Sequence, residues 1–397
     1  MRIAVIVHRL GPYHVARLNA LAQRCEVTVL ELTGMDKTYA WDKVSEGCHF
    51  ERVTLFDSLD TDAELRRRLP LELKRSLGRA RPEAVAAPGW GFAGALAALD
   101  WCLQNRVPAI LMTESQATDH PRSGYKERLK ALVVGRYSAA LVGGQTSADY
   151  ATALGMPRER IFAGYDVVDN RHFTEGAARA RADQGLRQAM GLPPRYWLAS
   201  NRFVPPKNLP MLLKAYARYR GQAGEGAPAL VLLGDGPLKP ELLALRRSLG
   251  LESQVLMPGF AQYQSLPAYY GLASAFVHVS TVEPWGLVIN EAMAAGLPVL
   301  CSNACGCFPD LLLEGRTGLG FDPRDEDALV GALAELGGMD TAALESMGRA
   351  GQAHIAGWSP DRFGESMAGA AQAALAQPRP GWPRLSGLFL RALARAL

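Results

Sequence analysis

Apolar residues recur along this chain in short runs rich in Val, Ile and Leu, and longer segments with the spacing of an amphipathic helix separate these runs. This alternation predicts strand–helix–strand units around buried parallel sheets. The predicted strands of the first half are Arg2–Val7, Glu26–Leu30, Ala84–Ala87, Ala109–Thr113 and Ala139–Val142. Those of the second half are Tyr196–Asn201, Ala229–Gly234, Gln254–Pro258, Ala275–Val279, Pro298–Ser302 and Gly318–Phe321. Each half is therefore expected to form its own doubly wound α/β sheet.

A polar stretch rich in Ala and Arg separates the two halves and ends at Pro193-Pro194. We place the linker between Asp169 and Pro194, with one domain at 1–175 and a second at 190–358. Helical patterns follow the last strand, and we expect the helix at about 360–378 to pack back on the first domain. Ligands of open parallel sheets bind beyond the carboxyl ends of the strands, so two such domains facing each other would form a cleft around the ligand.

The composition narrows the class of protein. The chain has 397 residues, 48% hydrophobic and 21% charged, which excludes a disordered or fibrous protein. Its 43 Lys and Arg nearly balance its 39 Asp and Glu, so no nucleic-acid partner is predicted. No apolar run reaches the roughly 18 residues of a membrane span, and six scattered cysteines do not form a disulfide framework. We predict a cytoplasmic, reduced protein.

No metal site is predicted. Cys301, Cys305 and Cys307 lie close together, but their spacing is not that of a zinc site. The acidic runs at 60–62 and 325–327 precede helical patterns, where carboxylates stabilise the helix N-terminus. We interpret both as helix caps.

Two cations follow the first strand of the second half. Arg202 offers a planar fork and Lys207 a point charge, a combination suited to a diphosphate, although solvated surface charge is the alternative. Gly234, after the next strand, either lets the backbone approach a phosphate or makes a tight turn into a helix.

The segment from Ser280 to Gly296 indicates chemistry most strongly. Glu283 lies in the loop after a strand, and Glu291 about one turn inside a helix that starts near Leu287. Gly286 shapes the helix entry, so the first backbone N–H groups form an anion site with a carboxylate on either side. One carboxylate could hold a sugar and the other a ribose. Helix capping by Glu283 and surface exposure of Glu291 are the alternatives.

Taken in order, these residues resemble those of the retaining GT-B glycosyltransferases of glycosyltransferase family four, over about Trp197–Pro323. The resemblance implies the GT-B fold, with two Rossmann-like domains facing across a cleft. It implies that Arg202 and Lys207 bind the donor diphosphate and that Glu283 binds hydroxyls of the transferred sugar. The implied donor-binding positions are Gly234, Phe260, Trp285, Gly286, Leu287 and Glu291, of which Phe260 would flank the base and Glu291 the ribose.

In the first half, the opening loop stands where related enzymes keep a Gly-containing loop against the donor phosphates and the acceptor. Gly11 is the candidate for the donor, and His8, Tyr13 and His14 are candidates for the acceptor. Glu114 stands where many relatives have a His near the reacting carbon. It is a candidate to orient or deprotonate the acceptor hydroxyl, with an ion pair to Arg122, itself an acceptor candidate, as the alternative.

A competing motif runs from Gly89 to Gly94. It fits the dinucleotide fingerprint, and Glu114 follows 20 residues after Gly94, as in an NAD-dependent dehydrogenase. The motif falls on a middle strand and leaves the second half unexplained. We therefore interpret its glycines as a tight turn with close packing.

The sequence thus predicts a retaining, metal-independent glycosyltransferase without a cofactor, in envelope polysaccharide or lipopolysaccharide assembly. Its partners would be a nucleotide-sugar donor and a glycan or lipid-linked acceptor. A GT-B-fold nucleotide-sugar epimerase and a non-catalytic sugar-nucleotide-binding subunit are the alternatives. Basic residues among leucines at 66–81 and in the amphipathic tail 379–397 suggest an anionic membrane surface as a further partner, at the inner face of the cell membrane.

Overall fold

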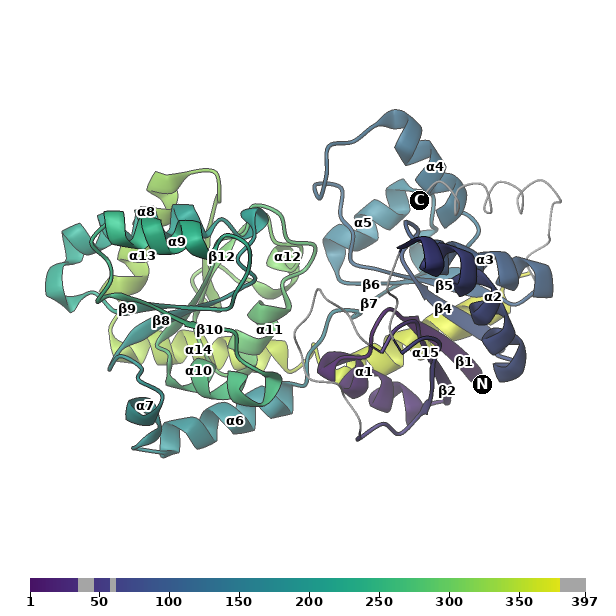
Figure 1. Ribbon diagram of the computed structural model, residues 1–397, viewed down its shortest axis with the longest axis horizontal. Coiled ribbons are helices and arrows are strands. Elements are labelled where there is room, and N and C mark those ends of the chain that lie inside the picture. Colours follow the sequence, from purple (N-terminus) through teal and green to yellow (C-terminus); the bar gives the residue numbers. More distant parts are fainter. Residues whose placement is uncertain (35–45, 58–61, 379–397) are drawn as a thin grey trace. The chain divides into compact units, whose positions relative to one another are not determined.

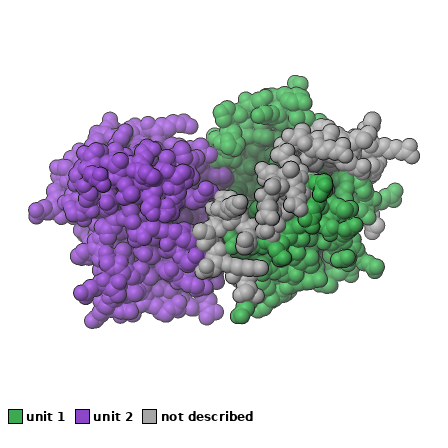
Figure 2. Space-filling view, in the orientation of Figure 1, with its two compact units in different colours: residues 1–167, 360–397 green, residues 168–359 purple. Residues whose placement is uncertain are grey.

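A computed structural model describes residues 1–34, 46–57 and 62–378 and divides them into two compact units. The first unit comprises residues 1–167 and helix α15 (Pro360–Ala376), and the second comprises residues 168–359 (Figure 2).

The first unit is built on a parallel sheet in the order β3-β2-β1-β4-β5-β6-β7 (Figure 1). Its strands are β1 (Arg2–Val7), β2 (Glu26–Glu31), β3 (Glu51–Thr54), β4 (Ala84–Pro88), β5 (Ala109–Thr113), β6 (Ala139–Val142) and β7 (Ile161–Ala163). Its other helices are α1 (Pro12–Ala22), α2 (Asp62–Ala80), α3 (Ala93–Asn105), α4 (Gly124–Val134) and α5 (Gln145–Ala153), with the 3-10 turn η1 (Arg158–Arg160).

Two edge strands of this sheet, β3 and β7, are absent from the sequence prediction. They have four and three residues, and most of those are only partly buried. Edge strands this short carry no apolar run, so they lack the pattern that identifies the central strands.

The second unit contains a parallel sheet in the order β10-β9-β8-β11-β12-β13. Its strands are β8 (Tyr196–Ser200), β9 (Ala229–Leu233), β10 (Val255–Gly259), β11 (Ala275–His278), β12 (Val299–Ser302) and β13 (Gly318–Phe321). Its helices are α6 (Asn170–Ala182), α7 (Leu186–Ala189), α8 (Leu209–Ala223), α9 (Lys239–Ser248), α10 (Leu266–Leu272), α11 (Leu287–Ala294), α12 (Phe308–Leu311), α13 (Glu326–Gly338) and α14 (Thr341–Ile355). Its 3-10 turns are η2 (Pro205–Lys207), η3 (Gly224–Gly226) and η4 (Tyr263–Ser265).

The expected linker contains helix α6, which belongs to the second unit. The Asp169 side chain caps this helix by accepting a hydrogen bond from the backbone N–H of His172 at 3.2 Å. One face of α6 is buried and packs on α10 through Phe173, Ala177 and Ala180. The other face is charged, and this composition is the reason why the sequence predicts a linker here. The boundary between the units therefore falls at Val167–Val168, earlier than the expected end at 175.

Helix α15 packs on α1 and on β6 and β7 of the first unit, although it follows the second unit in sequence (Figure 1). Gly364 lies so close to α1 that a Cβ there would be 2.9 Å from the backbone of Ala20. The Ser366 hydroxyl donates a hydrogen bond to the Ala163 carbonyl at 2.7 Å. These contacts make α15 a structural part of the first unit.

Candidate functional site

Lys207 and Glu283 form an ion pair although they lie 76 positions apart. Strand β8 precedes the turn that carries Lys207, and its neighbour β11 precedes the loop that carries Glu283. Adjacent parallel strands end at the same edge of a sheet, which brings the two loops together. A backbone hydrogen bond of 2.9 Å from the Thr281 N–H to the Pro206 carbonyl ties the loops to each other. The side chains of Lys207 and Glu283 are only 21% and 13% exposed.

The backbone around Glu283 is fixed from a second side by the segment after β12. Glu283 forms an isolated parallel bridge with Cys305, and the Gly306 N–H donates to the Glu283 carbonyl at 2.9 Å. The Cys307 N–H donates to the Trp285 carbonyl at 3.2 Å. The segment that contains Cys305 and Cys307 thus acts as a support for the Glu283 loop.

Three donors converge on one oxygen of Glu283. Besides Lys207, the Nε2 of His278 lies 3.0 Å and the Oγ of Ser280 lies 3.2 Å from Oε2. Burial raises the pKa of Glu283, but the His278 hydrogen bond and the Lys207 charge outweigh it and lower the pKa to about 2. Burial lowers the pKa of His278, but Cys305 and Glu283 raise it to about 9. Glu283 is therefore ionised at neutral pH.

The loop of Arg202 is pressed against the glycine turn after β9. Gly234 has a φ of 137°, and a Cβ there would overlap the backbone carbonyl of Asn201. A Cβ on Gly236 would lie 2.7 Å from the carbonyl oxygen of Phe203. Two backbone hydrogen bonds close this contact: from the Phe203 N–H to the Asp235 carbonyl at 2.9 Å, and from the Leu238 N–H to the Phe203 carbonyl at 3.0 Å. These glycines therefore shape the loop of Arg202, which is exposed.

Gly286 is the N-cap of α11 and has a φ of 107°, a conformation that glycine adopts without strain. Leu287 is the first residue of α11 and is half-buried. The indole of Trp285 points inward: it is 1% exposed and donates to the Asn290 side chain at 2.9 Å. Only the backbone of Trp285 is thus placed to contact a ligand at this helix end.

Glu291 is buried on α11, at 2% exposure, and accepts a hydrogen bond from the Tyr270 hydroxyl at 2.7 Å. Burial and the charge of Glu291 raise the pKa of Tyr270 well above its usual value, so the phenol remains a donor. Phe260 follows β10 and is 43% exposed, an unusual environment for a large aromatic side chain.

In the first unit, buried Glu31 holds the opening loop. Its Oε1 accepts from the Leu10 N–H at 2.8 Å, and its Oε2 accepts from Arg52 at 2.8 Å and from Thr54 at 2.7 Å. His8 is exposed, whereas Tyr13 is half-buried. Glu31 was not predicted as a functional residue, because a single acid at a strand end carries no sequence signal.

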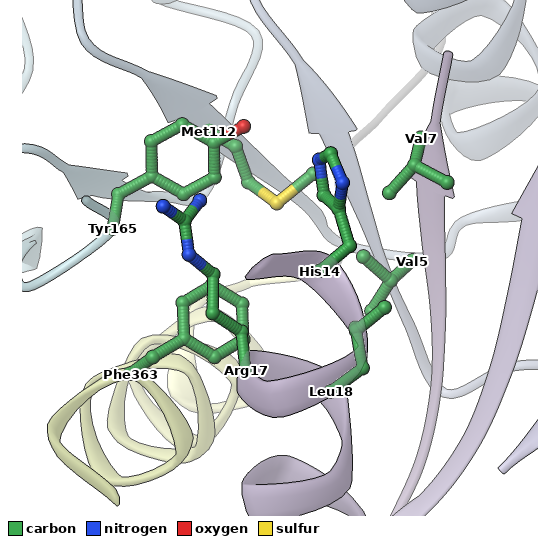
Figure 3. A pocket seen from close by; sticks show the side chains of 8 residues that line it. All are labelled: Val5, Val7, His14, Arg17, Leu18, Met112, Tyr165 and Phe363. Carbon is green, nitrogen blue, oxygen red and sulfur yellow. The ribbon is translucent and has the colours of Figure 1, made fainter. Parts of the chain in front are cut away.

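The N–H of Gly11 donates to the Nδ1 of His14 at 3.2 Å, so it is engaged within the loop. Burial and the charge of Arg17 lower the pKa of His14 to about 3, which makes the imidazole neutral. His14 and Arg17 of α1 line a cavity of about 10 Å³ together with Tyr165 and Phe363 (Figure 3). A space of this size holds at most one water, so it is not a sugar site.

Glu114 is exposed after β5, and its backbone carbonyl accepts from the Ser147 hydroxyl at 2.9 Å. Arg122 is paired elsewhere: its guanidinium lies 3.4 Å from the Glu127 carboxylate and donates to the Tyr150 hydroxyl at 2.6 Å. The ion pair that the structure gives Arg122 is therefore with Glu127.

The glycines of the competing dinucleotide motif have local structural roles. Gly89 has a φ of 72°, and its N–H donates to the Met112 carbonyl at 2.7 Å. A Cβ on Gly94, inside the buried helix α3, would overlap the Phe92 ring.

Residues 187–353 match the family model described as "Glycosyl transferases group 1". A GDP-mannose-dependent alpha-(1-6)-phosphatidylinositol monomannoside mannosyltransferase of Mycobacterium tuberculosis is 29% identical over 73% of each chain. The O-antigen chain mannosyltransferase B of Escherichia coli is 34% identical over 34% of each chain. Among solved structures, Anabaena HepE in complex with UDP and glucose shares the fold, with 20% identity, a TM-score of 0.70 and coverage of 93% of this chain and 98% of that one. The chain is a glycosyltransferase with the GT-B fold.

In this glycosyltransferase the family match contains Arg202, Lys207, Glu283 and Glu291. The predicted fold class and enzyme class are confirmed. Sequence reasoning missed two partners of Glu283, His278 at the end of β11 and Ser280 just after it. The only available signal was their position two residues apart at the end of a strand that leads into the motif.

Within the described ranges, no cluster of three or more His, Cys, Asp or Glu residues is arranged to hold a metal ion. No helix in the same ranges is long and apolar enough to cross a membrane. The predicted basic tail, residues 379–397, and the acidic cap residue Asp60 lie outside the described residues.

Proposed function

We propose that this glycosyltransferase moves a sugar from a nucleotide-diphosphate sugar to an acceptor hydroxyl in bacterial envelope assembly, with retention of the anomeric configuration. The main support for this proposal is the Lys207–Glu283 ion pair, which lies next to the N-terminus of α11. It sets a cation and an ionised carboxylate beside helix-terminal amides, a combination suited to a diphosphate and sugar hydroxyls. GDP-mannose is the first donor to test, because it is named for the M. tuberculosis relative.

The chemistry proposed for the donor is electrostatic. Arg202 and Lys207 stabilise the negative charge that grows on the departing diphosphate, and the first N–H groups of α11 add to this. Glu283 accepts hydrogen bonds from the sugar hydroxyls, and Glu291 accepts them from the ribose. The cations take the place of a metal ion, so none is required. Phe260 offers an exposed ring for the base.

On the acceptor side, Glu114 is the proposed group that orients or deprotonates the hydroxyl, because it is exposed beyond the carboxyl end of β5. His8 and Tyr13 are proposed contacts from the opening loop. His14 is neutral, and its Nδ1 accepts from Gly11, so it would act through an Nε2 proton as a donor and not as a base.

The test incubates the full chain with GDP-, UDP- and ADP-sugars and a lipid-linked acceptor extract, and follows nucleotide release and sugar transfer. Lys207→Ala and Arg202→Ala are each expected to lower turnover about 100-fold or more, the usual loss when one transition-state donor is removed. Lys214→Ala and Arg247→Ala are the matched controls, since both cations are exposed on helices of the same unit. Near-normal turnover in Lys207→Ala would refute the proposed role of this site in sugar transfer.

The same assay separates the alternatives. An epimerase converts the nucleotide sugar without an acceptor, and a non-catalytic subunit binds it without releasing nucleotide. Proton NMR of the product reports retention. Turnover should survive EDTA; a loss that only manganese restores would contradict the metal-independent mechanism. A nicotinamide cofactor that stabilises the chain in a thermal-shift assay would favour the dehydrogenase alternative.

We also propose that the first unit rests on an anionic membrane at the inner face of the cell membrane. The observation is α2, whose exposed positions Leu71, Arg75 and Arg79 follow one another at helical spacing while Leu73 and Leu77 are buried. Leu71 is 53% exposed. Co-sedimentation with vesicles of phosphatidylglycerol, but not phosphatidylcholine, is expected to weaken in Leu71→Ser and on removal of 379–397. Unchanged binding in both variants would refute the proposal.

A further inference from the structure

His278 is a buried titratable residue at the end of β11 for which the proposed chemistry has no use so far. Its side chain is 0% exposed, and its Nε2 lies 3.0 Å from Oε2 of Glu283. The Oγ of Ser280 is 3.0 Å from the same Nε2 and 3.2 Å from the same Oε2. The three groups form a compact triangle beneath the loop of Glu283.

The His278 ring has both polar and aromatic neighbours. Its Nδ1 is buried and has no hydrogen-bond partner among the described residues, and the ring stacks on Phe276 of the same strand with the centroids 6.3 Å apart. The titratable groups that face the ring are Glu283 and the Cys305 thiol, with Lys207 on the far side of Glu283. The imidazole is therefore fixed by packing, with Nε2 directed at the carboxylate.

The location of the proton follows from these contacts. An ionised carboxylate only accepts hydrogen bonds, so the approach of Nε2 to Oε2 is favourable only when Nε2 carries a hydrogen. The Ser280 hydroxyl donates to the same oxygen, and its own lone pairs face the ring nitrogen. Oε2 is thus saturated by donors from the protein, and the carboxylate plane is set by His278 and Ser280 together with Lys207.

We propose that His278 is a positioning residue: with Ser280 it locks Oε2 of Glu283 and thereby orients the carboxylate toward the hydroxyls of the donor sugar. This inference rests on the proposed function of Glu283. If Lys207 alone held the Glu283 carboxylate, the carboxylate would move whenever the lysine side chain moved to contact the diphosphate. Its orientation toward the sugar hydroxyls would then be less uniform. Small losses of orientation at a reacting sugar are costly.

The test measures the sugar-specific part of binding, defined as the ratio of the dissociation constant of GDP to that of GDP-mannose, or of the corresponding pair if the donor panel selects another nucleotide. In His278→Leu we expect this ratio to fall about tenfold, while GDP affinity changes less than about twofold and kcat also decreases. His278→Gln, which keeps an N–H at a similar reach, should recover most of the ratio. Ser280→Ala, a minimal change, should lower the ratio about threefold.

Val277→Ala is the matched control, because this neighbour in β11 is equally buried and points to the opposite face of the sheet. It should lose thermal stability but keep the wild-type ratio. Equal losses for GDP and GDP-mannose in His278→Leu, or a Gln variant as impaired as the Leu variant, would overturn the inference. If His278→Leu does not fold, the Ser280→Ala variant decides the question. A GDP to GDP-mannose ratio of dissociation constants that is unchanged in Ser280→Ala would also overturn the inference. A wild-type chain that binds no nucleotide sugar would instead overturn the proposed function, and this inference with it.

Discussion

Replacement of Gly234 by Ala tests how the glycine turn after β9 shapes the loop of Arg202. A Cβ at this position would overlap the carbonyl oxygen of Asn201 and lie 3.0 Å from its carbonyl carbon. The φ of 137° at Gly234 adds backbone strain, because side chains other than hydrogen rarely tolerate it. Alanine can therefore be accommodated only if the turn or the Asn201 peptide moves.

The magnitude follows from what that movement breaks. Backbone strain of this kind costs roughly 1–3 kcal/mol. Movement also lengthens the 2.9 Å hydrogen bond from the Asn201 N–H to the Leu233 carbonyl and the 2.8 Å bond from the Gly234 N–H to the Gly259 carbonyl, each worth about 1 kcal/mol. We expect Gly234→Ala to lower the free energy of unfolding by about 3–5 kcal/mol. Because Arg202 follows Asn201 directly, nucleotide affinity should fall as well.

Urea unfolding followed by tryptophan fluorescence measures the stability loss, since Trp197 and Trp285 are buried in the same unit. Gly331→Ala is the control: this glycine lies exposed in α13 with open space around it, so alanine there should stabilise the helix by about 0.5–1 kcal/mol. A Gly234→Ala protein with wild-type stability would refute the argument that close approach requires glycine at this position.

Two further predictions concern buried carboxylates. The folded pKa of Glu283, about 2, lies below its ordinary value of 4.5, so its ionisation stabilises the fold above pH 4.5 and this contribution is lost as the pH falls toward 2. The stability difference between wild type and Glu283→Gln should therefore shrink by about 2 kcal/mol between pH 7 and pH 3 in urea titrations, and a constant difference would contradict the pKa. Glu31→Gln should lower the free energy of unfolding of the first unit by about 2–3 kcal/mol, because Arg52 and the Leu10 N–H lose an ionised acceptor. Calorimetry measures this effect beside Glu26→Gln, an exposed acid of the same strand that should match wild type.

The central strands of both sheets were predictable because buried parallel strands need continuous apolar runs, which are visible one segment at a time. The predicted strand Ala109–Thr113 matches β5 residue for residue. Helix α6 was not recognised, because its buried face is small and its charged face dominates the composition of the segment. Its helical state depends on packing against α10, a contact with a segment about 90 positions away.

The sequence by itself determined the chemistry available at the donor site: the cations of the β8 loop, the two glutamates eight positions apart and the glycine at the entry of α11. Only the tertiary structure decided their partners. Lys207 meets Glu283 because β8 and β11 are neighbours in the sheet although β9 and β10 lie between them in sequence. The contact of His278 with Glu283 was likewise invisible, because a histidine at the end of an apolar strand carries no pattern that distinguishes a core residue from a hydrogen-bond donor. Strand order and side-chain direction set these distances, and both are properties of the folded chain.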